Sequence, residues 1–113
     1  MENIGAILKK YNNFKDAQLR SIYPLSDSSK VLILVIQDDD GEDLNSVEIE
    51  FSNITKSQIL DNSVLSYMDM GFGISIIEEH GLYGFALGQG TAMLHVHNAP
   101  LFIIASEVKI KEV

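Results

Sequence analysis

Two histidines separated by a single residue have a spacing that can bring two metal ligands together. His95 and His97 lie in residues 91–97, which we interpret as a strand. Residues i and i+2 of a strand point to the same face, so a third ligand from a neighbouring strand would complete a metal site. No zinc motif accompanies the pair, and His80 lies at an expected turn. The sequence therefore favours two surface histidines, with a small metal-dependent or acid–base enzyme using His95 and His97 as the alternative.

The densest charge cluster surrounds a single glycine, Gly41. A calcium-binding loop aligned on that glycine would put Ile36 at its first ligand position and Val47 at its last, and neither can ligate calcium. An Asp-Gly turn between two apolar runs instead indicates a solvated hairpin turn. It is also the best candidate for contact with a basic partner, through Asp38, Asp39, Asp40, Glu42 and Asp43.

The residues give little support for other catalytic or ligand-binding sites. The chain has no cysteine, which excludes a thiolate nucleophile and cysteine-ligated zinc, and no serine lies in a nucleophile-elbow motif. The glycines between residues 71 and 90 match neither the P-loop nor the dinucleotide fingerprint. Gly84 and Gly88 share a strand face with Leu82 and Ala86, which suggests close packing beneath a helix or a bend. We expect no cofactor, and these residues favour a binding protein over an enzyme.

Length and composition describe a single domain, residues 1–113. Hydrophobic residues make up 46% of the chain, enough to fill one core. The N-terminus lacks the apolar stretch of a signal peptide, and the longest apolar run, residues 31–36, is far too short to cross a membrane. Together with the missing cysteines, these features favour a cytoplasmic location.

The excess of acidic over basic residues indicates which kinds of partner to expect. Sixteen acidic and eight basic residues give a formal net charge of −8, and the basic residues are scattered. Nucleic-acid binding requires clustered Lys and Arg, so it is not expected. An acidic surface instead steers encounters with basic proteins, although solubility alone also explains it.

These residues need a scaffold, and the sequence predicts one that is mostly β. Ile4, Ile7, Leu8 and Tyr11 form one face of an N-terminal helix. Residues 31–36 and 47–51 predict a hairpin around the Asp-Gly turn, and residues 17–23, 72–78, 82–87, 91–97 and 101–110 predict further strands. Residues 55–58 fit a helix capping box, and residues 63–70 suit either a strand or a helix. We therefore expect an α+β fold, with the helix packed on about seven antiparallel strands rolled as a small barrel or sandwich.

Residues 13–22, Asn-Phe-Lys-Asp-Ala-Gln-Leu-Arg-Ser-Ile, resemble a motif of small bacterial β-rich domains of the Phe-His-Asp-Ala-x-Leu type, and residues 100–108 are similar to their closing strand. Some of these domains resemble toxin-immunity proteins, which act by binding a toxin. The resemblance implies a non-enzymatic, cytoplasmic protein. Lys15 replaces the histidine of the motif. A catalytic or metal role of that histidine would be lost here, whereas in a structural motif Asp16 could still accept backbone hydrogen bonds at the helix-to-strand junction.

The sequence thus predicts a protein-binding module that binds a basic protein partner through its acidic turn, and the resemblance implies an immunity-like role. No nucleic-acid or membrane partner is expected. Lys109 and Lys111 on the last strand oppose edge-to-edge pairing, so a monomer or at most a weak homodimer is expected.

Overall fold

A computed structural model describes residues 4–15, 17–65, 70–88, 90, 93–97, 99 and 101–112. Within these residues six antiparallel strands form one sheet in the order β1-β2-β3-β6-β5-β4. The strands are β1 (Gln18–Ser26), β2 (Ser29–Gln37), β3 (Asp43–Gln58), β4 (Ile74–Glu79), β5 (Leu82–Leu87) and β6 (Phe102–Glu112). The mostly-β antiparallel fold is confirmed. The expected seven strands and a barrel or sandwich are not, because the sheet stays open.

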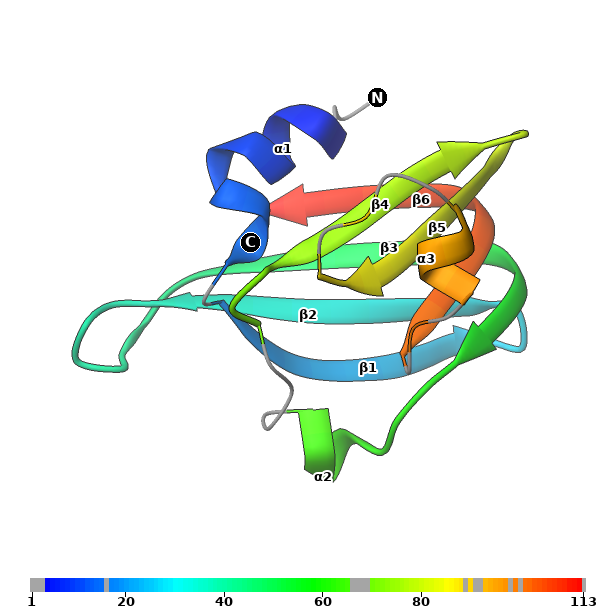
Figure 1. Ribbon diagram of the computed structural model, residues 1–113. Coiled ribbons are helices and arrows are strands. Elements are labelled where there is room, and N and C mark those ends of the chain that lie inside the picture. The colour runs from blue at the N-terminus through cyan, green and yellow to red at the C-terminus, as the bar shows by residue number, and fades with distance from the viewer. Residues whose placement is uncertain are drawn as a thin grey trace.

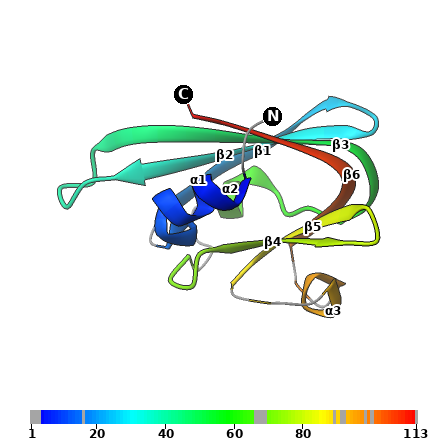
Figure 2. The same cartoon turned by 90° about the horizontal axis from the view of Figure 1, so that it is seen from above.

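The sheet is strongly bent, and β3 and β6 run through the bend (Figure 1). Figure 2, seen from above, shows β4 and β5 as a separate layer, drawn below the layer formed by β1, β2 and β3. The short helices are α1 (Ile4–Lys10), the 3₁₀ turn η1 (Asn12–Phe14), α2 (Asn62–Leu65) and α3 (Met93–His97). None of the helices within the described residues has the length and hydrophobicity needed to cross a bilayer.

The β2–β3 hairpin was predicted from sequence and is confirmed. Leu32 aligns with Ile49 and Leu34 with Val47, and all four side chains are buried. Glu48 and Glu50 alternate with the buried residues of β3 and lie on the opposite face. Only one face of β3 is buried, and this fixes the register, because a slip of one residue would turn its apolar side chains outward.

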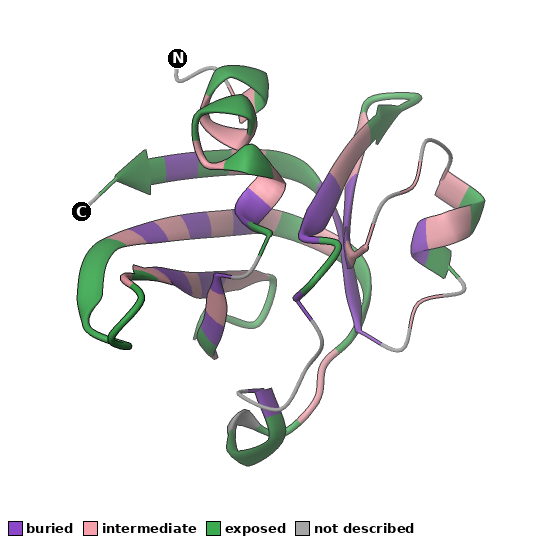
Figure 3. Ribbon diagram, turned by 60° about the vertical axis from the view of Figure 1, so that its left-hand side comes forward, coloured by how far each residue is buried: buried purple, intermediate pink, exposed green. Residues whose placement is uncertain are grey.

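The main core lies between the two halves of the bent sheet (Figure 3). Phe51 of β3 and Phe85 of β5 meet there with their ring centroids 5.6 Å apart. The predicted helix stripe, Ile4, Ile7, Leu8 and Tyr11, packs against this core. Tyr11 also stacks on the fully buried Phe14 at 5.3 Å. The N-terminal helix therefore seals one side of the core.

Helix α3 covers the other face of β5 and β6 and forms a second, smaller core with Ala86, Phe102 and Ile104. Its close approach depends on Gly84. A Cβ atom there would lie 2.5 Å from the Met93 sulfur and 3.0 Å from a methyl group of Val96. The sequence left two roles open for Gly84, close packing beneath a helix or a bend, and the structure shows the close packing.

Two elements differ from the sequence-based expectation. Residues 55–58 were interpreted as a helix start, but they continue β3 and pair with β6. Residues 93–97 were interpreted as part of a strand, but they form α3. For the ambiguous segment 63–70, α2 ends at Leu65 and residues 66–69 lie outside the described residues. Asp16 also lies outside them, so its expected role at the junction has no structural counterpart here.

Candidate functional site

The five acidic residues singled out from the sequence lie together at the tip of the long β2–β3 hairpin, which projects from the sheet in Figure 1. Asp38, Asp39, Asp40 and Glu42 belong to the connecting turn, and Asp43 opens β3. The expected hairpin turn is confirmed. The five side chains nevertheless have different surroundings, and these divide them into two groups.

Asp38 holds the turn in shape. Its Oδ1 atom accepts hydrogen bonds from the backbone N–H groups of Asp40 at 2.9 Å and Glu42 at 3.0 Å. The backbone N–H of Asp38 in turn donates to the carbonyl of Glu42 at 2.9 Å, and that of Gly41 donates to the carbonyl of Asp38 at 3.0 Å. An aspartate that satisfies turn N–H groups in this way is a local structural cap. Its carboxylate is therefore already engaged.

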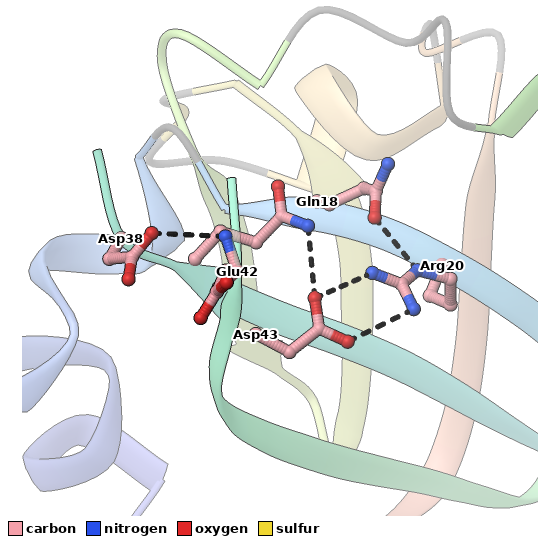
Figure 4. Close-up of polar contacts among 6 residues, drawn as sticks. Gln18, Arg20, Asp38, Glu42 and Asp43 are labelled. Atoms are coloured by element: carbon pink, nitrogen blue, oxygen red, sulfur yellow. Dashed lines mark hydrogen bonds and ion pairs between the residues drawn. The ribbon is translucent and has the colours of Figure 1, made fainter. Parts of the chain in front are cut away.

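Asp43 of β3 contacts side chains from two other strands, β1 and β2 (Figure 4). It accepts a hydrogen bond from Gln37 Nε2 at 2.9 Å and forms an ion pair with Arg20 Nη2 at 3.1 Å. The bond from Gln37, followed by those from Arg20, lowers the pKa of the Asp43 carboxyl. Arg20 lies at a bulge in β1 and also donates to Gln18 at 2.7 Å. This network ties the base of the turn to the sheet.

The remaining acidic side chains, Asp39, Asp40 and Glu42, are exposed and make no hydrogen bond or ion pair with any described residue. Beside them Leu44 is 60% exposed, at the bulge where the β2–β3 register shifts. We call Asp39, Asp40, Glu42 and Leu44 the hairpin tip. Sequence reasoning missed Leu44. The other even-numbered positions at the start of β3 carry polar side chains, so a leucine there departs from the alternation.

His95 and His97 do not converge as the strand interpretation required. In an α-helix, residues two apart point about 200° away from each other. His95 is half-buried, with its Nε2 atom 3.2 Å from the carbonyl oxygen of Leu87 and its ring against Gly90. A carbonyl only accepts, so Nε2 must carry the proton and donate. His95 therefore fastens α3 to the end of β5.

His97 lies on the exposed side of α3, with its ring centroid 6.2 Å from that of Phe102. It lines an open pocket of about 490 Å³ together with His80, which lies at the β4–β5 turn. The pairing of His95 with His97 that the sequence suggested is therefore not formed, and His97 shares only a pocket lining with His80. No three described His, Asp or Glu side chains come close enough to form a metal site.

A second hollow, of about 390 Å³, lies along β2, β3 and β6 and includes Val31. There the register places Glu50 opposite Lys109 and Glu48 opposite Lys111. The two charge signs balance along this hollow, so it has no preference for a basic or an acidic partner.

Comparisons with protein-family models, with curated proteins and with solved structures give no match to this chain. The function proposed for it is therefore derived from its own residues.

Proposed function

We propose that this protein is a non-enzymatic binding module that recognises a basic protein partner through the hairpin tip. The observation that carries the proposal is the division among the acidic residues. Asp38 and Asp43 hold the turn in one shape, while the carboxylates of Asp39, Asp40 and Glu42 face solvent with no hydrogen-bond or ion-pair partner among the described residues. A turn that is already ordered loses little conformational entropy when it binds.

The chemistry of the hairpin tip suits a protein partner. Three carboxylates on a molecule of net charge −8 attract and orient a basic surface over a distance. Leu44 adds an exposed apolar side chain that a partner can bury, and apolar anchors surrounded by charge are typical of interface centres. The resemblance of residues 13–22 to the Phe-His-Asp-Ala-x-Leu motif supports an immunity-like, cytoplasmic version of this role, with a toxin as the basic partner.

The proposal is tested by neutralising the free carboxylates only. A basic partner is first captured at low salt with this protein as bait. In the variant Asp39→Asn/Asp40→Asn/Glu42→Gln, we expect association with that partner to be about tenfold slower at low salt, with a flatter dependence on ionic strength. Surface plasmon resonance at several salt concentrations measures both quantities. Leu44→Ser should mainly increase the dissociation rate, because the loss of a short-range contact does not alter long-range steering.

The matched control, Asp27→Asn/Glu48→Gln/Glu107→Gln, also neutralises three carboxylates but leaves the hairpin tip unchanged. The proposal fails if both triple variants slow association equally, since net charge alone would then explain the effect. It also fails if neither variant changes the association rate.

A further inference from the structure

The pocket beside α3 is lined by residues of α3 and of the strands around it. Leu82 of β5 and Ile104 of β6 contribute apolar side chains, and α3 contributes Met93, Leu94 and His97. The remaining lining residues are Thr55 and Lys56 near the end of β3, Glu79 at the end of β4, and His80 in the β4–β5 turn. Its volume of about 490 Å³ is in the range of small-molecule sites.

Two local features of the backbone shape this pocket. Gly84 lets α3 approach the sheet closely, as described above. On the other side, a bulge at Thr55 shifts the β3–β6 register so that Lys56, rather than Thr55, is aligned with Ile104. The Thr55 hydroxyl donates to the Ile104 carbonyl at 3.3 Å and stabilises the bulge. Bulges commonly re-aim a side chain beside a site, and here the re-aimed side chain is a lysine.

The charged side chains around the pocket differ in whether they have partners within the protein. Lys56 is exposed and has no hydrogen bond or ion pair with any described residue. Glu79 accepts a hydrogen bond from the backbone N–H of Met93 at 3.4 Å and lies 3.9 Å from Nε2 of His80. Glu79 is thus partly satisfied by its own neighbours, and Lys56 is the charge left available to a ligand.

Leu94 supplies apolar surface that the fold does not use. Its side chain is 69% exposed, the highest exposure among the large hydrophobic residues described, yet it lies at the pocket. Val96, on the opposite side of the short helix, is fully buried and supplies the packing.

From these contacts we infer that the pocket binds a small amphiphilic monoanion, with its apolar body against Leu82, Ile104 and Leu94 and its carboxylate towards Lys56. A single negative charge suits the site, because Glu79 and the net charge of −8 both oppose a polyanion such as a nucleotide. This site is separate from the hairpin tip and does not depend on the function proposed for it.

A matched ligand series tests the inference. Octanoate, octanol and octylammonium share one apolar chain and differ in charge, and each is titrated below its micelle concentration into the ¹⁵N-labelled protein. We expect octanoate to shift amide resonances of the pocket residues and to bind about fivefold more tightly than octanol, as expected for one exposed charge contact. Octylammonium should bind more weakly than octanol.

Two surface substitutions separate the ionic from the apolar contribution. Lys56→Gln should abolish the preference for octanoate over octanol and leave octanol binding unchanged. Leu94→Ser should weaken both ligands. The controls are Lys9→Gln, which removes a charge on α1, and Leu44→Ser, which removes an exposed leucine at the hairpin tip. The amide spectrum verifies that each variant is folded.

The inference is wrong if octanoate shifts resonances scattered over the surface, or if Lys56→Gln and Lys9→Gln have the same effect. The hairpin-tip proposal would be untouched by either result, because its partner assay depends on Leu44 and not on Leu94.

Discussion

At the scale of single residues, Ser75 is the one buried polar side chain among the described residues. Its hydroxyl donates to the carbonyl of Gly88 and accepts from the N–H of Gly90 at 3.0 Å, so it holds the chain that follows β5. Ser75→Ala should lower the free energy of unfolding by about 1–3 kcal/mol, because two backbone groups lose a partner in a poorly solvated place. Urea denaturation measures the change.

Ser106→Ala is the control, since Ser106 is exposed on β6. Surface changes of this kind alter stability by less than about 0.5 kcal/mol. If Ser75→Ala has an equally small effect, water replaces the hydroxyl and the contact is dispensable.

The roles of some residues could be predicted from the sequence, and those of others could not. An Asp-Gly pair between apolar runs revealed the turn, and Gly84 on an otherwise apolar strand face revealed a close approach. The role of Ser75 gave no such signal, because its partners are 13 and 15 residues away and are backbone atoms. The availability of Lys56 likewise depends on a bulge and cannot be read from its neighbours in sequence.

At the scale of elements, the contact between α1 and β6 should make stability depend on pH. Glu112 accepts hydrogen bonds from Lys10 at 2.7 Å and from the Tyr11 hydroxyl. The Lys10 bond, followed by the Tyr11 bond, lowers the pKa of Glu112, and the bond to Glu112 raises the pKa of both Lys10 and Tyr11. The contribution of Glu112 is therefore complete above its ordinary pKa of 4.5 and is lost as pH falls through the lowered value.

Glu112→Gln should thus reduce the melting temperature at neutral pH and make little difference in strong acid. In alkali, the difference in melting temperature between the wild type and Glu112→Gln should become smaller again as pH rises past the raised pKa of Tyr11. The ordinary pKa of tyrosine is 10.0. Thermal denaturation across pH checks both limbs, with the exposed Glu107→Gln as control. A difference that is constant with pH would show that Glu112 acts by packing alone.

Elements whose partners are close in sequence were predicted well, as the β2–β3 and β4–β5 hairpins show. His80 and Gly81 both have positive φ, as a tight hairpin turn requires. The prediction of a helix start at residues 55–58 was wrong because the capping-box pattern reflects only neighbouring residues. The strand there is stabilised by pairing with a distant segment, as between Gln58 and Phe102 of β6. Residues 93–97 alternate like a strand, yet Leu94 is exposed and Val96 buried, which only the helix allows.

At the scale of the whole molecule, β6 pairs with β3 on one side and with β5 on the other, and the main core contains residues from both halves of the bent sheet, β1–β3 and β4–β5. We therefore expect one cooperative unfolding transition. In native-state hydrogen exchange, amides of β2, β3, β5 and β6 should share one free energy of opening. Helix α1 has no buried residue and should open at a lower free energy. Separate values for β1–β3 and β4–β5 would show that the halves unfold independently.

The place of β6 in the sheet also bears on how the chain folds during synthesis. β6 is the last of the described strands to leave the ribosome, yet it lies between β3 and β5. The β1–β3 meander and the β4–β5 hairpin can each form from local contacts, but no strand joins them until β6 emerges. Until then, the edges of β3 and β5 that β6 will cover are unpaired, and nascent chains on neighbouring ribosomes could pair through them.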